Sequence, residues 1–148
     1  MSKSSIAAQR ARVVELAREW LGTPYHHHGD VQGAGVDCAM LLVRVFSDAG
    51  MIPSIDPRPY PYDWHMHRDA ERYMGWVEQY ARRVDAPLPG DVILWRFGRT
   101  FSHGAIYIGN GRIIHSYLNI GCVLGTVADA QLAGRKAIYY SLFPEEAA

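Results

Sequence analysis

The spacing of apolar residues in the first third of the chain predicts two helices. In residues 5–21, apolar side chains recur every three or four positions among arginines and glutamates, which is typical of an amphipathic helix. Gly22 and Pro24 favour its end there. Residues 38–49 contain neither glycine nor proline and are apolar on almost every face, so we expect a buried central helix.

The pattern after residue 50 predicts mainly strands. Prolines and aromatic residues in 50–68 indicate an ordered, irregular cover, and 69–84 has the spacing of a further helix. Alternating and β-branched residues then predict strands over 92–95, 103–108, 112–117, 120–126 and 136–143. The intervening segments 29–35, 97–102 and 128–133 are expected to be a loop, a polar connection and a short helical turn. Helices followed by an antiparallel sheet of four to six strands define an α+β fold, and we expect residues 1–148 to form a single domain.

Composition and charge exclude several classes of partner. The 148 residues are 49% hydrophobic with formal net charge zero and a pI of about 7.1, so no overall field favours nucleic acid or an acidic membrane. Arg10 with Arg12, and Arg82 with Arg83, are interpreted as solvated helix faces. The polar N-terminus has no signal-peptide pattern, and no apolar run approaches the ~18 residues of a membrane span. We therefore expect synthesis in the cytoplasm without a signal peptide.

Candidate chemistry begins at Asp37 and Cys38. Asp37 is a favoured N-cap residue, and Gly35 before it permits a sharp turn. A thiol in the first helical turn experiences the positive end of the helix dipole, which favours the nucleophilic thiolate. The same residues are equally compatible with a small buried cysteine that has no chemical role.

His103 and His115 lie on two strands joined across residues 109–111. A two-residue turn at Asn110 and Gly111 would pair residue 106 with 115 and put the histidines on opposite faces. A three-residue loop with Gly111 as a left-handed bulge would pair 105 with 115, leaving the histidines on one face with Cβ atoms ~7 Å apart. We expect that second register, and we expect this face to pack on the Cys38 helix.

Such an arrangement would provide a nucleophile, a base and an orienting group. His103 would accept the Cys38 proton, and His115 would fix the tautomer of His103. Taken singly, each histidine is better explained as an ordinary strand residue, and it is the arrangement of all three residues that favours catalysis.

Other residues suggest weaker possibilities. The histidines of two segments could suggest zinc, but no cysteine or carboxylate accompanies them at a tight spacing, so we expect no metal and no cofactor. These histidines are His26, His27, His28, His65 and His67. Cys122 could form a disulfide with Cys38, although a buried strand cysteine suits a reducing compartment better.

Five motifs in order resemble the NlpC-type cell-wall peptidases, which are papain-like cysteine endopeptidases of bacteria and phages. The motifs are Gly22-Thr23-Pro24-Tyr25, Asp37-Cys38, Leu88-Pro89-Gly90-Asp91-Val92, His103-Gly104-Ala105-Ile106-Tyr107-Ile108-Gly109 and Ile114-His115. The resemblance extends over roughly residues 10–140. The loop 29–35 and the Pro/Tyr/Trp-rich segment 57–64 are most similar to the phage-tail branch of that family.

The resemblance implies a function and a set of site residues. It implies cleavage of the peptidoglycan stem peptide between γ-D-glutamate and a diamino acid, with Cys38, His103 and His115 as catalytic residues. Tyr25 would bind substrate or the oxyanion beside the Cys38 backbone N–H. The implied partners are bacterial cell-wall peptide as substrate and phage tail proteins, and the implied location is a phage tail that acts on the cell wall.

Two departures from the family pattern affect specificity. Family members usually have Ser-Gly after Asp-Cys, and that serine helps the aspartate to hold the amine of an N-terminal L-alanine; here the residues are Ala39 and Met40. Asp37 alone could still bind an amine. The residues after Tyr25 also differ from the usual pattern. A non-catalytic tail assembly protein and another thiol amidase or acyltransferase remain as alternative functions.

Overall fold

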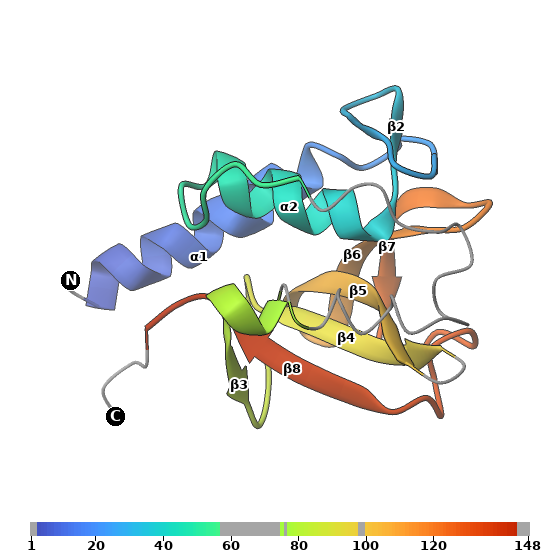
Figure 1. The fold of residues 1–148 in the computed structure, drawn as a ribbon. Coiled ribbons are helices and arrows are strands. Elements are labelled where there is room, and N and C mark those ends of the chain that lie inside the picture. Colours follow the sequence, from blue (N-terminus) through green and yellow to red (C-terminus); the bar gives the residue numbers. More distant parts are fainter. Residues whose placement is uncertain (1–2, 57–74, 76, 98–99, 145–148) are drawn as a thin grey trace.

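The computed structural model describes residues 3–56, 75, 77–97 and 100–144 (Figure 1). Two long helices, α1 (Lys3–Arg18) and α2 (Cys38–Asp48), confirm the predicted helical segments. Helix α1 ends before residue 21 because residues 19–22 continue as turns. Helix α1 buries one side only, and helix α2 is almost wholly buried, as the apolar spacing predicts.

Six antiparallel strands form the main sheet, in the order β3-β8-β4-β5-β6-β7. Their bounds are β3 (Arg82–Val84), β4 (Val92–Phe97), β5 (Thr100–Gly109), β6 (Arg112–Tyr117), β7 (Gly121–Thr126) and β8 (Ala137–Ser141). Figure 1 shows both helices on one side of this sheet. The α+β class and the predicted number of strands are therefore confirmed.

Three local predictions need correction. The 29–35 loop contains a small hairpin of β1 (Asp30–Val31) and β2 (Gly35–Val36). The end of the predicted helix 69–84 is strand β3, because it pairs with β8 after a helical turn at residues 77–80. Strands β4 and β5 extend into the predicted 97–102 connection. Residues 128–133 form turns, and the predicted helical turn is present where the Ala133 N–H donates to the Asp129 carbonyl at 2.8 Å. Residues 57–68 of the predicted cover, and residues 69–74 and 76 of the predicted helix, lie outside the described residues.

The sheet buries apolar residues on both faces, and this overturns one prediction. Ile106 and Ile114 belong to the larger core cluster with the residues of α2. Ala105 and Ile113, at the alternating positions, pack instead with Leu132 in a second cluster. The face that carries His103 and His115 is therefore not the face that packs on α2, because side chains alternate along each strand and the turn segment around Leu132 covers the other side.

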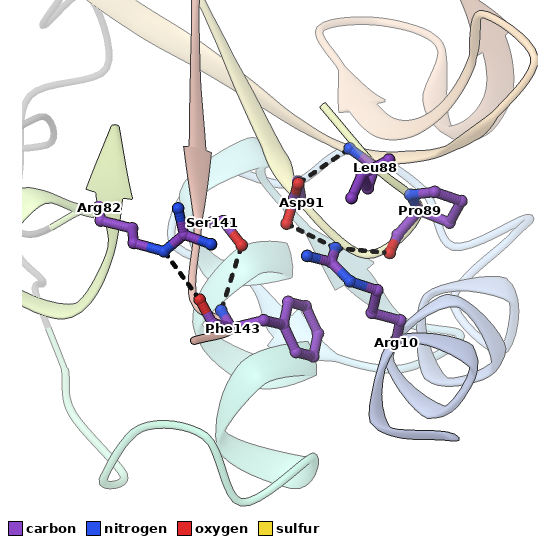
Figure 2. A network of polar contacts seen from close by, with 7 residues as sticks. All are labelled: Arg10, Arg82, Leu88, Pro89, Asp91, Ser141 and Phe143. Atoms are coloured by element: carbon purple, nitrogen blue, oxygen red, sulfur yellow. Dashed lines mark hydrogen bonds and ion pairs between the residues drawn. The ribbon is translucent and has the colours of Figure 1, made fainter. Parts of the chain in front are cut away.

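A buried ion pair connects α1 to the start of β4 (Figure 2). The Arg10 guanidinium donates to Asp91 Oδ1 at 2.8 Å and to the carbonyl of Pro89 at 3.1 Å. Asp91 Oδ2 accepts from the backbone N–H of Leu88 at 2.9 Å, and the Arg10 guanidinium also lies over the ring of Phe143. The interpretation of Arg10 as solvated is therefore wrong, since the side chain is buried against this turn.

The remaining basic residues of that interpretation are exposed. Arg12 lies on the solvent side of α1, and Arg82 and Arg83 are exposed on β3, where Arg82 donates to the carbonyl of Phe143 (Figure 2). Within the part of the chain that the structure describes, no helix has the length and apolar character to cross a membrane.

Candidate active site

The start of α2 is held by hydrogen bonds on both of its sides. Asp37 is the N-cap, as predicted, and its Oδ1 accepts from the Met40 N–H at 2.9 Å. Its Oδ2 accepts from the His28 N–H at 2.8 Å. The Ser116 hydroxyl on β6 donates to the carbonyl of Val36 at 2.7 Å, so the two residues before Cys38 are tied both to the preceding loop and to the sheet.

Cys38 is buried at this junction, and its thiol interacts with the backbone of β5. Burial, together with the negative charge of Asp37, raises the pKa of the Cys38 thiol to about 12. Hydrogen bonds from the backbone of Gly104, Cys38 and Ala39 act in the opposite direction but are weaker. The helix terminus favours the thiolate, as expected, but desolvation outweighs this effect and favours the protonated thiol.

The turn between β5 and β6 determines how the two histidines meet. Asn110 and Gly111 are both left-handed, with φ of 55° and 74°, and form a two-residue turn between the paired residues Gly109 and Arg112. A bulge between Tyr107 and Gly109 then shifts the register by one residue. Beyond this bulge the pairs are Tyr107 with Ile113 and Ile106 with Ile114, which is the register that a three-residue loop would have produced.

As a result His103 and His115 lie within hydrogen-bond distance. Nε2 of His103 is 2.8 Å from Nδ1 of His115, and both rings are buried. The same-face prediction is confirmed, although the extra residue is in β5 before the turn and not at Gly111. The catalytic roles of the two histidines stay predictions.

Both imidazoles are neutral at pH 7. Burial, the neighbouring His115 and the charge of Arg135 lower the pKa of His103 well below 6.5. Burial also lowers the pKa of His115 to about 4, against the opposing effect of the Asp129 carboxylate. The Cys38 thiol contacts the backbone of Gly104, the residue that follows His103. A neutral thiol and a neutral histidine can react by general-base catalysis, in which the proton leaves sulfur as sulfur attacks.

The remaining predicted site residues surround the Cys38 turn. Tyr25 forms an isolated β-bridge with Val36, which places its backbone beside the residues that lead into α2. Ala39 and Met40 are buried in the core, so no polar side chain follows the cysteine.

The loop that carries His26, His27 and His28 is not arranged as a metal centre. His27 and His28 stack at 3.8 Å between ring centroids, and His27 Nδ1 is 4.0 Å from Asp37. Among residues 3–56, 75, 77–97 and 100–144, no group of three or more His, Cys, Asp or Glu is placed to hold a metal ion. His65 and His67 lie outside these ranges. Cys38 and Cys122 are not joined by a disulfide.

Sequence reasoning missed Asp129, which lies in the turn after β7. Its charge acts on His115, and its carboxylate faces that ring at Gly125. Nothing in the spacing of Asp129 from either histidine suggested this proximity. The β6–β7 pairing and the turn that follows create it.

Comparisons with known proteins agree with this architecture. The chain is 24% identical over 118 residues to the murein DD-endopeptidase MepS/murein LD-carboxypeptidase of Escherichia coli strain K12, which covers 80% of the chain and 55% of that protein. It is 32% identical over 108 residues to the gamma-DL-glutamyl hydrolase of Bacillus subtilis strain 168, covering 70% of the chain and 22% of that protein. The chain thus spans about half, or less, of the length of these relatives.

Solved structures with the same fold include two peptidoglycan hydrolases. RipB of Mycobacterium tuberculosis superposes with a TM-score of 0.68 at 19% identity, over 98% of the chain and 70% of that structure. The NlpC/p60 domain of SagA superposes with a TM-score of 0.58 at 22% identity, over 87% of the chain and 96% of that structure. The model of the NlpC/P60 family matches residues 22–129, a range that includes Cys38, both histidines and Asp129, and the chain therefore belongs to the NlpC/P60 family.

Proposed function

We propose that this chain is a cysteine endopeptidase domain of residues 1–148 that hydrolyses an amide bond of the peptidoglycan stem peptide. The observation that carries the proposal is the 2.8 Å contact between His103 and His115, next to the strand residue Gly104 whose backbone interacts with the Cys38 thiol. Membership of the NlpC/P60 family supports it, as do relatives named murein endopeptidase and gamma-DL-glutamyl hydrolase.

In the proposed reaction, Cys38 is the nucleophile and His103 the base. As sulfur attacks the carbonyl carbon, the S–H proton moves to Nδ1 of His103, the ring nitrogen that does not face His115. The imidazolium then donates this proton to the leaving amine, and water releases the acyl group from sulfur. The backbone N–H of Cys38 and the Tyr25 hydroxyl are proposed to stabilise the oxyanion.

The bond we propose is the one between γ-D-glutamate and the diamino acid. Both Asp37 oxygens accept backbone hydrogen bonds, and the next two residues, Ala39 and Met40, are apolar. This surrounding offers little to an amine, so we propose that the enzyme does not require a free N-terminal L-alanine. We further propose delivery by a phage or prophage tail, on the resemblance of the 29–35 loop and segment 57–64 to that branch.

The second candidate is a non-catalytic tail assembly protein that keeps the fold. The observation in its favour is the burial of Cys38, which raises the pKa of the thiol to about 12. Another thiol amidase or acyltransferase is distinguished by its products, because a transferase leaves a product heavier than the hydrolysis fragments.

Mass spectrometry of defined stem peptides tests the proposal. Wild type is expected to cleave γ-D-glutamyl–diamino acid bonds in peptides with either a free or an N-acetylated L-alanine, and Cys38→Ala is expected to have no activity. Cys122→Ala is the matched control, since Cys122 is also buried but lies on β7, and it should retain activity. Cleavage that survives in Cys38→Ala, or no cleavage of any stem peptide by wild type, would contradict the proposal.

A further inference from the structure

The His115 ring has an unsatisfied polar atom in a fully buried position. Nε2 of His115 makes no hydrogen bond with any residue that the structure describes. Every other buried side-chain nitrogen or oxygen among the described residues has a hydrogen-bond partner. Buried polar atoms nearly always have a partner. Since Nδ1 of the same ring is occupied by His103, the free Nε2 indicates that something beyond the histidine pair acts on this ring.

The carboxylate of Asp129 and this ring nitrogen both lie close to Gly125. A Cβ added at Gly125 would lie 3.1 Å from Nε2 of His115 and 2.7 Å from Oδ2 of Asp129. Any side chain at position 125 would therefore push against both groups. Glycine allows the imidazole of His115 and the carboxylate of Asp129 to approach the same point of β7.

Asp129 is held in this orientation as an anion. Its Oδ2 accepts from the backbone N–H of Thr126 at 3.0 Å, and its Oδ1 accepts from the Thr126 hydroxyl at 2.9 Å. These hydrogen bonds hold the pKa of Asp129 below its usual value of 3.8. The carboxylate is thus ionised at neutral pH and fixed by a short turn that begins where β7 ends.

We propose that Asp129 is a positioning residue that acts through His115 to select the tautomer in which His103 is a base. The catalytic consequence rests on the peptidase function proposed above, whereas the effect on the ring of His115 does not. The argument comes from counting protons in the neutral histidine pair.

Only one proton can lie between Nε2 of His103 and Nδ1 of His115. If His103 donates it, Nδ1 of His103 keeps a lone pair for the thiol proton, and His115 carries its own proton on Nε2, facing the carboxylate. If His115 donates it, His103 carries its proton on Nδ1 and cannot accept another, and the lone pair of His115 Nε2 faces the negative charge of Asp129. The carboxylate therefore stabilises the first arrangement and destabilises the second.

The same charge also favours the reaction itself. When the S–H bond of Cys38 breaks and an N–H bond forms at Nδ1 of His103, the histidine pair gains one positive charge. Asp129 remains ionised and keeps no proton, so it stabilises this charge at a distance. Arg135, which lowers the pKa of His103, acts against it.

The tautomer can be observed directly by long-range ¹H–¹⁵N NMR of the histidine rings. In the wild type, His115 is expected to carry its proton on Nε2 at pH 7. In Asp129→Asn, His115 is expected to populate the Nδ1–H form, whereas Asp48→Asn, which removes a half-exposed carboxylate at the far end of α2, should leave the ring unchanged. A wild-type His115 protonated on Nδ1 would overturn the inference, and this measurement needs no variant to fold.

Activity provides the second readout. Asp129→Asn is expected to lower kcat/KM roughly 10- to 100-fold, as is typical of lost orienting groups, and to move the acid limb of the pH profile to lower pH. An unchanged tautomer with an unchanged acid limb would show that Asp129 only caps its turn. If the wild type cleaves no stem peptide but the tautomer responds to Asp129→Asn, the proposed function fails and the role of Asp129 stands.

Discussion

Two buried polar pairs, one between α1 and the residue before β4 and one between β5 and β6, differ in how completely their hydrogen bonds are satisfied. Arg10 and Asp91 form an ion pair in which the guanidinium also reaches the Pro89 carbonyl, and the second carboxylate oxygen holds the N–H of Leu88 (Figure 2). His103 and His115 share one hydrogen bond, and Nε2 of His115 has no partner among the described residues.

The difference separates a structural pair from a chemical one. The Arg10 pair holds a guanidinium and a carboxylate together at 2.8 Å, and so it joins α1 to the residue before β4. The histidine pair consists of two neutral rings whose shared proton can lie on either nitrogen. A buried group that is fully paired is expected to contribute to stability, and one that is incompletely paired is expected to contribute to reactivity.

The largest effect is expected when the ion pair is broken from one side. Arg10→Met leaves Asp91 as a buried charge without its partner, which should lower the free energy of unfolding by about 3–5 kcal/mol. Denaturant unfolding at pH 7 measures this loss. Arg12→Met is the matched control on the same helix, and because Arg12 is exposed its effect should stay within about 0.5 kcal/mol. Equal effects of the two variants would mean that Arg10 has no structural role.

The histidine pair should instead make stability depend on pH. The pKa of His115 is about 4 in the folded protein and near 6.5 when unfolded, so the unfolded state binds the proton more tightly. Above about pH 6.5, His115 does not change the free energy of unfolding. As the pH decreases from 6.5 towards 4, His115 alone lowers the free energy of unfolding by about 3 kcal/mol. The lowered pKa of His103 has the same sign and adds to this loss.

Unfolding curves between pH 4 and 7 measure this slope. His115→Asn should flatten it, while His26→Asn, at an exposed position of the preceding loop, should leave it as in the wild type. A slope that His115→Asn does not change would mean that His115 is not held neutral by burial.

The contrast between these pairs also shows what could be predicted from the sequence. The helices, most of the strands and the proximity of His103 to His115 follow from local periodicity and turn chemistry. The burial of Arg10 does not, because it depends on Asp91 and Phe143, which are far along the chain. Asp129 escapes notice for the same reason, since its place beside His115 depends on a glycine in another strand.

The protonation state of the Cys38 thiol depends on two effects that act in opposite directions. The position of Cys38 at a helix start favours the thiolate, and the sequence shows that position plainly. It does not show how completely the thiol is desolvated, and this desolvation is the largest effect that raises the pKa of Cys38, with the charge of the adjacent Asp37 second. The pKa of the Cys38 thiol is therefore set by burial in the folded protein, whereas its position at a helix start follows from the local sequence.

The smallest expected effect concerns Arg135, the charge that opposes Asp129 at the histidine pair. Arg135 is exposed and stacks over the ring of Phe97 at 3.8 Å, and its charge lowers the pKa of His103. Arg135→Gln should therefore move the acid limb of kcat/KM to higher pH, opposite in sign to Asp129→Asn. Because solvent screens an exposed charge, the shift should be roughly 0.3 pH unit at low salt and should vanish near 1 M salt.

The control is Arg112→Gln, which removes an exposed arginine of β6 next to the turn of the hairpin and should leave the acid limb in place. A shift of the same sign for Arg135→Gln and Asp129→Asn would mean that neither charge acts on the histidine pair electrostatically. Shifts of the acid limb in opposite directions for the two variants, with only the Arg135→Gln shift lost at high salt, would show that the histidine pair responds to the charges around it.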